Sequence, residues 1–573
     1  MGKATIGLRG AALVGVGALL LSACGGGDNG GGGSDTGDAT PGGTITFLSI
    51  GSQIQHLDPQ RNYTGEDLAF AGAYMHRTLI TYDYVEGGDG WNVVPDLATD
   101  LGTPNEDATS WSFTLRDGAT FENGDPVTCE DVKYGVSRTF AQDVISDGPT
   151  YAISMLDVED YVGPYDKSAK NNVEGFDQAV TCDGSTITFN LSRPVPDFNY
   201  ATTLLAFSPV PEAEDTGESY DDRPISSGPY KIETYEKKRE LVLVPNDEWD
   251  PESDPVRTRL PDKIVMEFGL AQDVIDERLI TDAGDDTTSL GYSDLDPSRF
   301  ATVFNDPRFE DRRVDEFDPY VTYIAVDVTQ VPNEKHRQAI AAAIDRTALR
   351  AAAGGDFAGD YADGLIKSNF TPWYEPTGLW EGLLGEPVPD EGNPELAKKL
   401  IQESGEPMPK LCYDYATSPA ADKSTKALIE SMAAAGIDLT ANPIDPGQYY
   451  GIVLSDKHCQ LMNSGWGPDW ANPSTVIPEL LGAEAGFNLS RLNTGGKTQD
   501  QAFEDGIQEA LVETDQDTQI QMWADLNTEA AQKAYIIPRF FTKTQRLAGS
   551  DVGGAYIWAP YGSWSYGNLY VNQ

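Results

Sequence analysis

The second half of the chain alternates extended runs with amphipathic stretches, and this alternation constrains the fold more than any other feature. Extended runs such as LCYDYATS and CQLMNSGW are interleaved with the helix-like stretches NPELAKKLIQESG and STKALIESMAAAGIDL. Strands that alternate with helices are typical of βαβ units, in which neighbouring strands are parallel. Residues 320–520 are therefore predicted to fold around a parallel sheet.

One helix of this region is well marked at both ends. It follows an extended run at residues 321–328, and Asn333 is suited to cap its first turn. Apolar residues then recur at four-residue intervals, at Ile340, Ile344 and Ala348. The pair Gly354-Gly355 ends the pattern, because glycine favours the C-terminal end of a helix. A single helix is predicted between these two signals.

The first half contains strands with one buried face. In SWSFTLRDG and STITFNLSRP, apolar and polar residues alternate. The alternation places the apolar side chains of each run on one face of the strand: Trp111, Phe113 and Leu115 in the first run, and Ile187, Phe189 and Leu191 in the second. Between them, DPVTCEDVKYGVSRTF is predicted to be helical from about Thr128. This part of the chain is predicted to form a small domain of its own around a sheet.

Length and charge narrow the class of protein. A chain of 573 residues is too long for one hydrophobic core, so two to four domains are expected. It carries 40 basic and 91 acidic residues, a formal net charge of −51. A surface this negative repels phosphate backbones and disfavours a nucleic-acid partner. It indicates a well-hydrated acidic surface and does not identify the ligand.

The N-terminal segment is typical of an exported protein. Lys3 and Arg9 precede the apolar run AALVGVGALLLSA at residues 11–23, which is shorter than the roughly 20 residues that span a bilayer. Residues 1–23 are therefore predicted to be a signal peptide. The sequence LSAC that ends at Cys24 resembles a bacterial lipoprotein lipobox, which implies cleavage before Cys24 and lipid on its thiol. An ordinary secretory signal followed by an incidental cysteine is the alternative.

The segment after Cys24 is predicted to be a tether. Residues 24–43 are rich in Gly, Asp and Ser, and such a composition cannot form a core. The tether would place the folded part just outside the membrane, held by the lipid on Cys24.

The remaining four cysteines predict two disulfides in an exported chain. Three pairings are possible. The pairing that keeps each bridge within one region of the chain is favoured, namely Cys129–Cys182 with Cys412–Cys459.

Catalytic and metal-binding patterns are largely missing. Neither the GxSxG nucleophile elbow nor HExxH occurs, and the four histidines are scattered without a CxxC pair. The run TGGKT lacks the earlier glycine of a phosphate-binding loop, because Arg491 occupies that position. The sequence predicts a protein that is not an enzyme and has no cofactor and no metal site.

Four segments in chain order carry a family resemblance. Residues 95–140 begin with PDLA and include FENGDP, and residues 226–251 contain SSGPY and end at NDEWDP. Residues 331–349 contain HRQAIAAAIDR, with His336 where the family usually has valine, and residues 465–481 contain GWGPDWANP. Together these segments resemble solute-binding family 5, the extracytoplasmic peptide-binding proteins of ABC importers.

The resemblance implies a two-lobed α/β fold of the periplasmic-binding-protein type (type II, the large peptide-binding class), with a ligand cleft and a hinge between the lobes. The first lobe would be discontinuous, with residues 44–90, 206–315 and 530–573. A small α+β domain would be inserted at residues 91–205. The second lobe would hold residues 316–529.

The same resemblance implies a ligand-binding role for the segment GWGPDWANP. In peptide-binding members, the carboxylate at the position of Asp469 pairs with the α-ammonium of the peptide, and the preceding tryptophan, here Trp466, lines the cleft. Trp470 and Asn472 belong to the same segment. Pro468 departs from the usual pattern and affects where the carboxylate points. The alternative is that Asp469 caps a turn before Pro473. A basic residue is needed for the peptide carboxylate, and Arg491 and Arg539 are the candidates.

The predicted function is that of a receptor, with no catalysis of its own, which delivers peptides to an ABC permease. The implied partners are a peptide or another small solute, the transmembrane subunits of the permease, and its cytoplasmic ATPase. The protein is expected to be a monomer on the extracytoplasmic face of the cell membrane, anchored only by lipid. The alternatives are the same fold with another solute, such as an oligosaccharide, and, more remotely, a secreted hydrolase.

Overall fold

The computed structural model describes residues 39–572. The predicted signal peptide, Cys24 and most of the predicted tether lie outside the described residues. Within the described part, no helix combines the length and the apolar character needed to cross a membrane.

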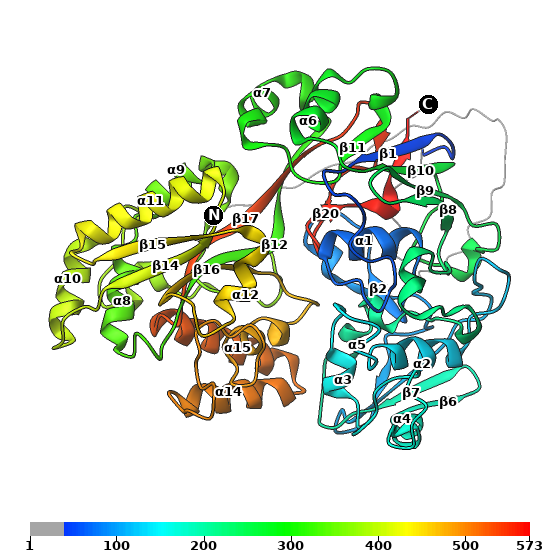
Figure 1. Ribbon diagram of the computed structural model, residues 1–573, viewed down its shortest axis with the longest axis horizontal. Helices are drawn as coiled ribbons and strands as arrows, with labels where there is room; N and C mark the ends of the chain where they lie inside the picture. Colours follow the sequence, from blue (N-terminus) through cyan, green and yellow to red (C-terminus); the bar gives the residue numbers. More distant parts are fainter. Residues whose placement is uncertain (1–38, 573) are drawn as a thin grey trace, which may run out of the picture. The chain divides into compact units, whose positions relative to one another are not determined.

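A six-stranded sheet forms the centre of the second half of the chain (Figure 1). In spatial order its strands are β13 (Asp360–Tyr361), β17 (Ile536–Leu547), β12 (Arg313–Val326), β16 (Leu461–Trp466), β14 (Leu411–Ala416) and β15 (Leu439–Ile444). The strands β14, β15 and β16 are parallel to one another, but β12 is antiparallel to both β16 and β17. The prediction of a parallel sheet is therefore right for three strands and wrong for the remainder.

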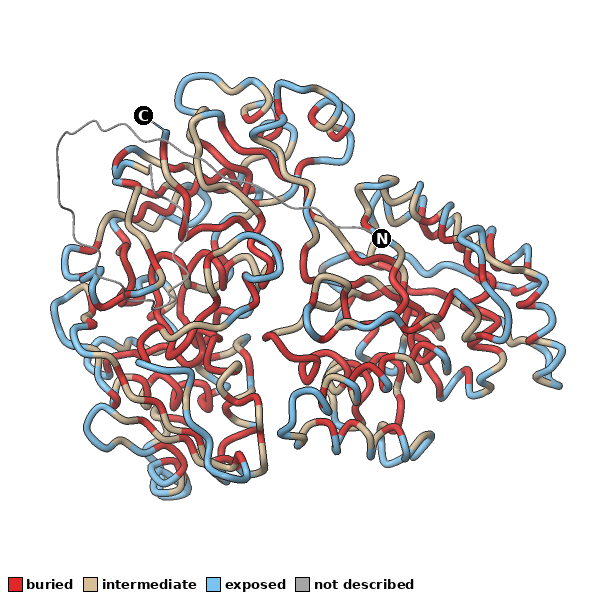
Figure 2. Tube along the Cα trace, turned by 180° about the vertical axis from the view of Figure 1, so that it is seen from behind, coloured by how far each residue is buried: buried red, intermediate tan, exposed pale blue. Residues whose placement is uncertain are grey.

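Helices cover both faces of this sheet. Ile324, Leu461 and Ile537 share a core with helices α8 (Glu334–Ala343), α10 (Pro394–Glu403) and α11 (Pro419–Ala434). Their sheet neighbours Tyr323, Met462 and Ile536 share a core with α14 (Gln501–Val512) and α15 (Gln516–Gln532). Successive side chains of a strand point to opposite faces, so the two cores follow from the period of two. Figure 2 shows buried residues following the strands, with exposed residues on loops and outer helix faces.

The single helix predicted after Asn333 is two helices. Asn333 caps α8 as expected, with its side chain accepting a hydrogen bond from the backbone N–H of Lys335 at 3.0 Å. The chain leaves the helix at Ile344, and α9 (Arg346–Ala352) begins again after Asp345. Asp345 accepts a hydrogen bond from the N–H of Ala348 at 2.7 Å, which is a new N-cap. The continuous apolar spacing hid this break.

A five-stranded sheet lies in the first half of the chain. In spatial order it holds β11 (Ser289–Gly291), β1 (Thr44–Leu48), β10 (Lys263–Glu267), β9 (Glu240–Pro245) and β8 (Tyr230–Glu236). Helix α1 (Gly65–Tyr74) packs against it, with the ring of Phe70 at 5.8 Å from that of Phe47. Strand β1 lies between β11 and β10 and brings the start of the described chain into the same core as residues 230–291.

A four-stranded antiparallel sheet forms a third core, as the alternating patterns predict. Its order is β4 (Thr103–Pro104), β5 (Ser110–Thr114), β7 (Thr186–Asn190) and β6 (Val180–Asp183). The side chains of Trp111, Phe113, Ile187 and Phe189 are all buried, which confirms the one-sided pattern. Helix α2 (Cys129–Arg138) begins after Thr128, where Thr128 and Asp131 form a capping box.

Two long strands connect the cores. Residues 313–317 at the start of β12 pair with residues 543–547 of β17. Residues 321–325 near the end of β12 pair with residues 536–541 at the start of β17. The register shifts between Phe317 and Val321, where the pair bends. Strand β17, which lies after the predicted lobe boundary at residue 530, is a strand of the six-stranded sheet, and the boundary itself stays a prediction. A twelve-residue strand is long enough to pair along both halves of β12.

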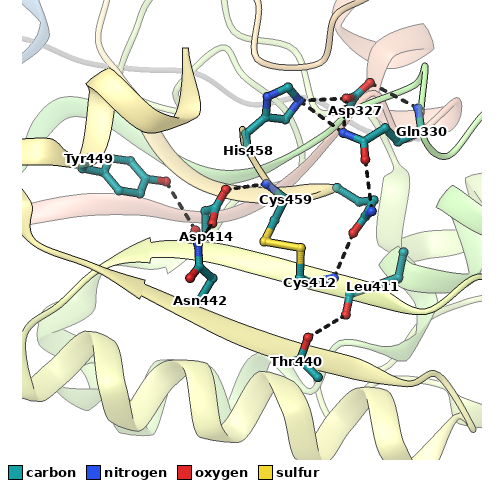
Figure 3. Close-up of a disulfide and its surroundings, with 11 residues drawn as sticks. Asp327, Gln330, Leu411, Cys412, Asp414, Thr440, Asn442, Tyr449, His458 and Cys459 are labelled. Carbon is teal, nitrogen blue, oxygen red and sulfur yellow. Dashed lines mark hydrogen bonds and ion pairs between the residues drawn. A yellow bond between two sulfur atoms is a disulfide. The ribbon is translucent and has the colours of Figure 1, made fainter. Parts of the chain in front are cut away.

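Two disulfides lie within these cores, in the pairing favoured from the sequence. Cys129 bonds to Cys182 beside the four-stranded sheet, and Cys412 of β14 bonds to Cys459, just before β16. Figure 3 shows the second bridge surrounded by hydrogen bonds. Asp414 accepts from the backbone N–H of Cys459 at 2.6 Å and from the side chain of Asn442 at 2.6 Å. The bridge and these bonds fasten three neighbouring strands.

Loss of the first bridge is expected to destabilise the domain that contains it. Its two cysteines are 53 residues apart, and closing a loop of that length in the unfolded chain corresponds to about 4 kcal/mol. The double substitution Cys129→Ser with Cys182→Ser should lower the free energy of unfolding by about that amount, measured by urea denaturation. The control is Cys24→Ser, because Cys24 belongs to neither bridge. Equal free energies of unfolding for the double variant and the Cys24→Ser control would contradict the expectation.

Candidate functional site

The segment GWGPDWANP leaves the end of β16 and forms a tight turn. Asn472 caps the short 3₁₀ helix η12 (Pro473–Thr475), with its side chain accepting from the N–H of Ser474 at 2.9 Å. The hydroxyl of Thr475 accepts from the backbone N–H of Asp469 at 3.0 Å. Asn472 is thus the turn cap, and the backbone of Asp469 is fixed while its carboxylate takes no part in the turn.

The carboxylate of Asp469 is held by two tyrosines from distant parts of the chain. It accepts hydrogen bonds from the hydroxyl of Tyr63 at 3.0 Å and from the hydroxyl of Tyr151. Burial raises the pKa of Asp469 to about 6, although both hydroxyl bonds favour the charged form. Between residues 39 and 572, no basic side chain forms an ion pair with it. This is a carboxylate in largely apolar surroundings with no cation of its own.

The neighbouring tryptophans have different surroundings. Trp466 donates from its ring nitrogen to the carbonyl of Thr475 at 2.7 Å and packs on Phe487, with 5.1 Å between ring centres. Trp470 is 2% exposed and belongs to the core around the four-stranded sheet. Its ring nitrogen donates to Asp197 at 3.0 Å, and its ring meets that of Tyr151 edge-on. The turn after β16 therefore contacts the domain of the four-stranded sheet directly.

A cavity of about 510 Å³ lies beside this contact. Its walls include Tyr63, Tyr151, Trp466, Trp470 and Phe487, and thus come from all three parts of the fold. A cavity of this size is in the range that small ligands occupy. Aromatic walls with a few polar groups are the usual composition of such a site.

The charged residues of the cavity wall are mostly acidic. The carboxylates are those of Asp197, Glu479, Glu484 and Glu504, and the single cationic side chain in the wall is that of Arg193. Glu479 lies on α13 (Ile477–Leu481), and its pKa is raised to about 7 by burial and by the charge of Asp469. The side chain of Arg193 donates to the carbonyl of Pro194 at 3.4 Å and is in no ion pair within the described chain.

The remaining predicted site residues lie elsewhere. Asn472 is buried, acts as the cap and donates to Gln519 at 3.0 Å, so it does not line the cavity. Arg491 donates to the carbonyl of Val453 at 2.9 Å and to that of Ser455 at 3.4 Å, and these carbonyls hold its guanidinium away from the cavity. Neither Asn472 nor Arg491 is among the residues that line the cavity, and their ligand-binding role stays a prediction.

Arg539, the other candidate for a peptide carboxylate, is also placed elsewhere. It donates to the side chains of Asn463 and, at 3.0 Å, Ser424. It lines a separate cavity of about 280 Å³ beside the six-stranded sheet. Arg539 belongs to strand β17 of the six-stranded sheet, so the alternation of side chains along that strand sets the direction of its side chain.

Four residues of the cavity wall were not predicted from the sequence: Tyr63, Tyr151, Arg193 and Glu479. The first three come from segments that are hundreds of residues away, and no local pattern links them to Asp469. Glu479 is the exception, because it lies within the quoted segment at residues 465–481. An acidic side chain ten residues after the aspartate was the only available signal.

Comparison with known proteins gives a consistent result. The model of the bacterial extracellular solute-binding proteins, family 5, matches residues 92–488, which is more than half of the chain. The periplasmic oligopeptide-binding protein OppA of Salmonella typhimurium is 23% identical over 549 residues, covering 91% of each chain.

Solved structures extend the likeness. The structure titled clavulanic acid biosynthesis oligopeptide binding protein 2 is 27% identical, with a TM-score of 0.83, over 93% of this chain and 96% of that one. OppA of Haemophilus influenzae, solved in complex with the peptide RPPGFSPFR, is 18% identical with a TM-score of 0.67, over 92% and 99%. These likenesses confirm the two-lobed α/β fold, and the chain belongs to the bacterial extracellular solute-binding proteins of family 5.

Proposed function

We propose that the protein is an extracytoplasmic receptor that captures peptides between its lobes and delivers them to an ABC permease. The observation that carries this proposal is the carboxylate of Asp469, which faces two tyrosine hydroxyls and no cation beside a cavity of about 510 Å³. A peptide α-ammonium has the charge and the hydrogen-bond donors that this carboxylate lacks. Membership of a family whose relatives are named as oligopeptide-binding proteins supports the same ligand class.

The other end of the peptide is assigned to Arg193. It is the single cation in the cavity wall, and a guanidinium recognises a carboxylate through paired hydrogen bonds. Arg193 therefore replaces Arg491 and Arg539 as the proposed partner of the peptide carboxylate. With the ammonium at Asp469, this would fix the direction of the peptide in the cavity.

The remaining parts of the proposal concern the whole molecule. Cys24 carries the lipid that holds the protein at the cell membrane, and residues 24–43 act as the tether. The protein acts as a monomer without catalysis, and its permease partner supplies the transmembrane subunits and ATPase. The two lobes, with residues 91–205 as an inserted domain, close over the ligand by motion about β12 and β17.

Mass spectrometry of the molecules that co-purify with the gently denatured protein tests this function. Peptides with free amino termini are expected in the released fraction. A fraction that contains only oligosaccharide would favour the alternative ligand. Turnover of peptides or glycosides by the purified protein would instead indicate a hydrolase.

The affinity for a free-amine peptide is expected to fall as the pH is lowered. In the free protein the pKa of Asp469 is about 6 and that of Glu479 about 7, and a bound cation lowers both. Binding therefore releases protons, so affinity rises with pH up to about 7, above which the peptide's α-amino group, with a pKa of about 8, begins to lose its charge. Between pH 7 and pH 5, calorimetry should record a weakening of at least about tenfold.

The groups that face Asp469 support the attribution of this pH dependence to the carboxyls of Asp469 and Glu479. They are the carboxyl of Glu479 and the hydroxyls of Tyr63, Tyr151, Tyr82, Tyr320 and Tyr561, and burial raises the pKa of every one of these tyrosines. Only the two carboxyls titrate between pH 5 and 8. An N-acetylated peptide is the control and should show little pH dependence. A flat profile for the free-amine peptide would contradict the expectation.

A further inference from the structure

Glu479 is a carboxylate in the cavity wall without a partner. It is half-buried on α13, and within residues 39–572 it makes no hydrogen bond or ion pair. Asp469, by contrast, accepts two tyrosine hydroxyls. Unpaired acids are uncommon in such positions, because removing a charge from water without a partner is costly. A carboxylate without a partner in a ligand cavity indicates that a group of the ligand supplies its hydrogen bonds or its counter-charge.

The other acids of the wall differ from Glu479. Asp197 accepts from the ring nitrogen of Trp470 and from the hydroxyl of Ser474. Glu504 accepts from the backbone N–H of Ala483 at 3.0 Å. Glu484 is exposed to solvent. Among the acids of this wall, Glu479 alone is both half-buried and without a hydrogen bond.

One ligand ammonium carries a single positive charge, whereas Glu479 and Asp469 together carry two negative charges when both are ionised. The two carboxylates repel each other, which contributes to the raised pKa of Glu479. A peptide with an uncharged first side chain brings one positive charge for two acids, so the pair keeps an excess negative charge or one of the acids stays protonated. A cationic side chain next to the α-ammonium brings the second charge. Electrostatic complementarity therefore favours a ligand with two neighbouring cations.

The aromatic part of the wall suits such a side chain. Trp466 and Phe487 pack together at 5.1 Å and lie in the same cavity wall as Glu479. Lysine and arginine place apolar stems along aromatic surfaces while the charged end reaches an acid, and their cations interact favourably with aromatic faces. Charge and shape thus point to the same class of ligand.

We propose that Glu479 is a specificity-determining residue that selects peptides with lysine or arginine at or next to the amino terminus. This inference rests on the proposed peptide-binding function and narrows its ligand class. Glu479 binds the cationic side chain, while Asp469 binds the α-ammonium of the same peptide.

The test compares Lys-Ala-Ala with norleucine-Ala-Ala, whose first side chain is close in shape but uncharged. Calorimetry at pH 7.5 on the full mature protein is expected to give a Kd at least about tenfold lower for the lysine peptide. In Glu479→Gln, this preference should shrink to about twofold or less while the norleucine peptide still binds. In the matched control Glu509→Gln, the preference should persist, because that acid is exposed on α14 and is not among the residues that line the cavity.

The outcomes separate the two proposals. Equal affinities of the wild-type protein for both peptides, or an undiminished preference in Glu479→Gln, would overturn the role of Glu479 and leave the receptor function standing. Failure of both peptides to bind the wild-type protein would overturn the receptor function and this inference together. An unchanged melting temperature of Glu479→Gln shows that a lost preference does not come from unfolding.

Discussion

Replacing Asp469 with asparagine is expected to weaken the binding of a free-amine peptide by at least about a hundredfold. Asparagine keeps the shape of the side chain and an oxygen that accepts from Tyr63 or Tyr151, but removes the negative charge. The α-ammonium would then be buried without a counter-ion, and breaking a buried ion pair costs about 3 kcal/mol or more. That cost is a factor of at least about one hundred in Kd.

Calorimetry with a free-amine tripeptide and its N-acetylated form measures this effect. The acetylated peptide should bind weakly to the wild-type protein and lose little further affinity in Asp469→Asn. Asp456→Asn serves as the matched control, because Asp456 is an exposed aspartate of the same half of the chain. Small and equal losses for the two peptides would show that Asp469 does not bind the ammonium.

The second large effect is expected on stability, from Asp96→Ala. Asp96 is fully buried, and each of its carboxylate oxygens forms an ion pair with an arginine. Oδ1 lies 2.8 Å from Nε of Arg77, and Oδ2 lies 2.8 Å from Nη1 of Arg257. Both guanidinium groups are themselves buried, and the remaining acid near them is Asp254, at 3.4 Å from each. Removing Asp96 leaves two buried cations with one carboxylate, which should lower the free energy of unfolding by about 3–5 kcal/mol.

This cluster joins the start of the four-stranded-sheet domain to the five-stranded-sheet part, so its loss should loosen that junction. Chemical denaturation of Asp96→Ala and wild type gives the difference. Asp222→Ala is the control, because Asp222 pairs with Lys237 at 2.7 Å on the surface and such pairs contribute less than about 1 kcal/mol. Comparable decreases in the free energy of unfolding for Asp96→Ala and Asp222→Ala would mean that the buried ion pairs of Asp96 stabilise the fold no more than a surface pair does.

Local patterns predicted the local structure well. The alternation at Trp111 and Phe113 placed the right side chains inside. The helix predicted from about Thr128 begins at Cys129, and Asn333 caps its helix as expected. Patterns of this kind depend on neighbours in sequence, which is why they succeed. The break at Ile344 escaped detection because Asp345 supplies a new cap inside an unbroken apolar repeat.

Long-range pairing was predicted less well. Strand β12 has the composition of any buried strand, and nothing in it specifies antiparallel partners on both sides. The extension of β17 along β12 likewise depends on residues more than two hundred positions apart. The alternation of strands and helices therefore predicted a parallel sheet, and the antiparallel pairing of β12 with β16 and β17 had no local signal.

The candidate site divides in the same way. One short segment supplied Asp469, Trp466 and Trp470 as candidates, and the two tryptophans line the cavity. The hydroxyls of Tyr63 and Tyr151 and the guanidinium of Arg193 come from other parts of the fold, so only the folded chain brings them together. The guanidinium of Arg491 donates to backbone carbonyls, a feature that the sequence does not record.

A crystal structure of the protein with a free-amine tripeptide tests the central claim most directly. The proposal predicts the α-ammonium at about 3 Å from the carboxylate of Asp469, with the peptide in the cavity between Trp466 and Tyr151. It also predicts the peptide carboxylate beside Arg193. A peptide bound with its ammonium away from Asp469, or a peptide outside this cavity, would contradict it.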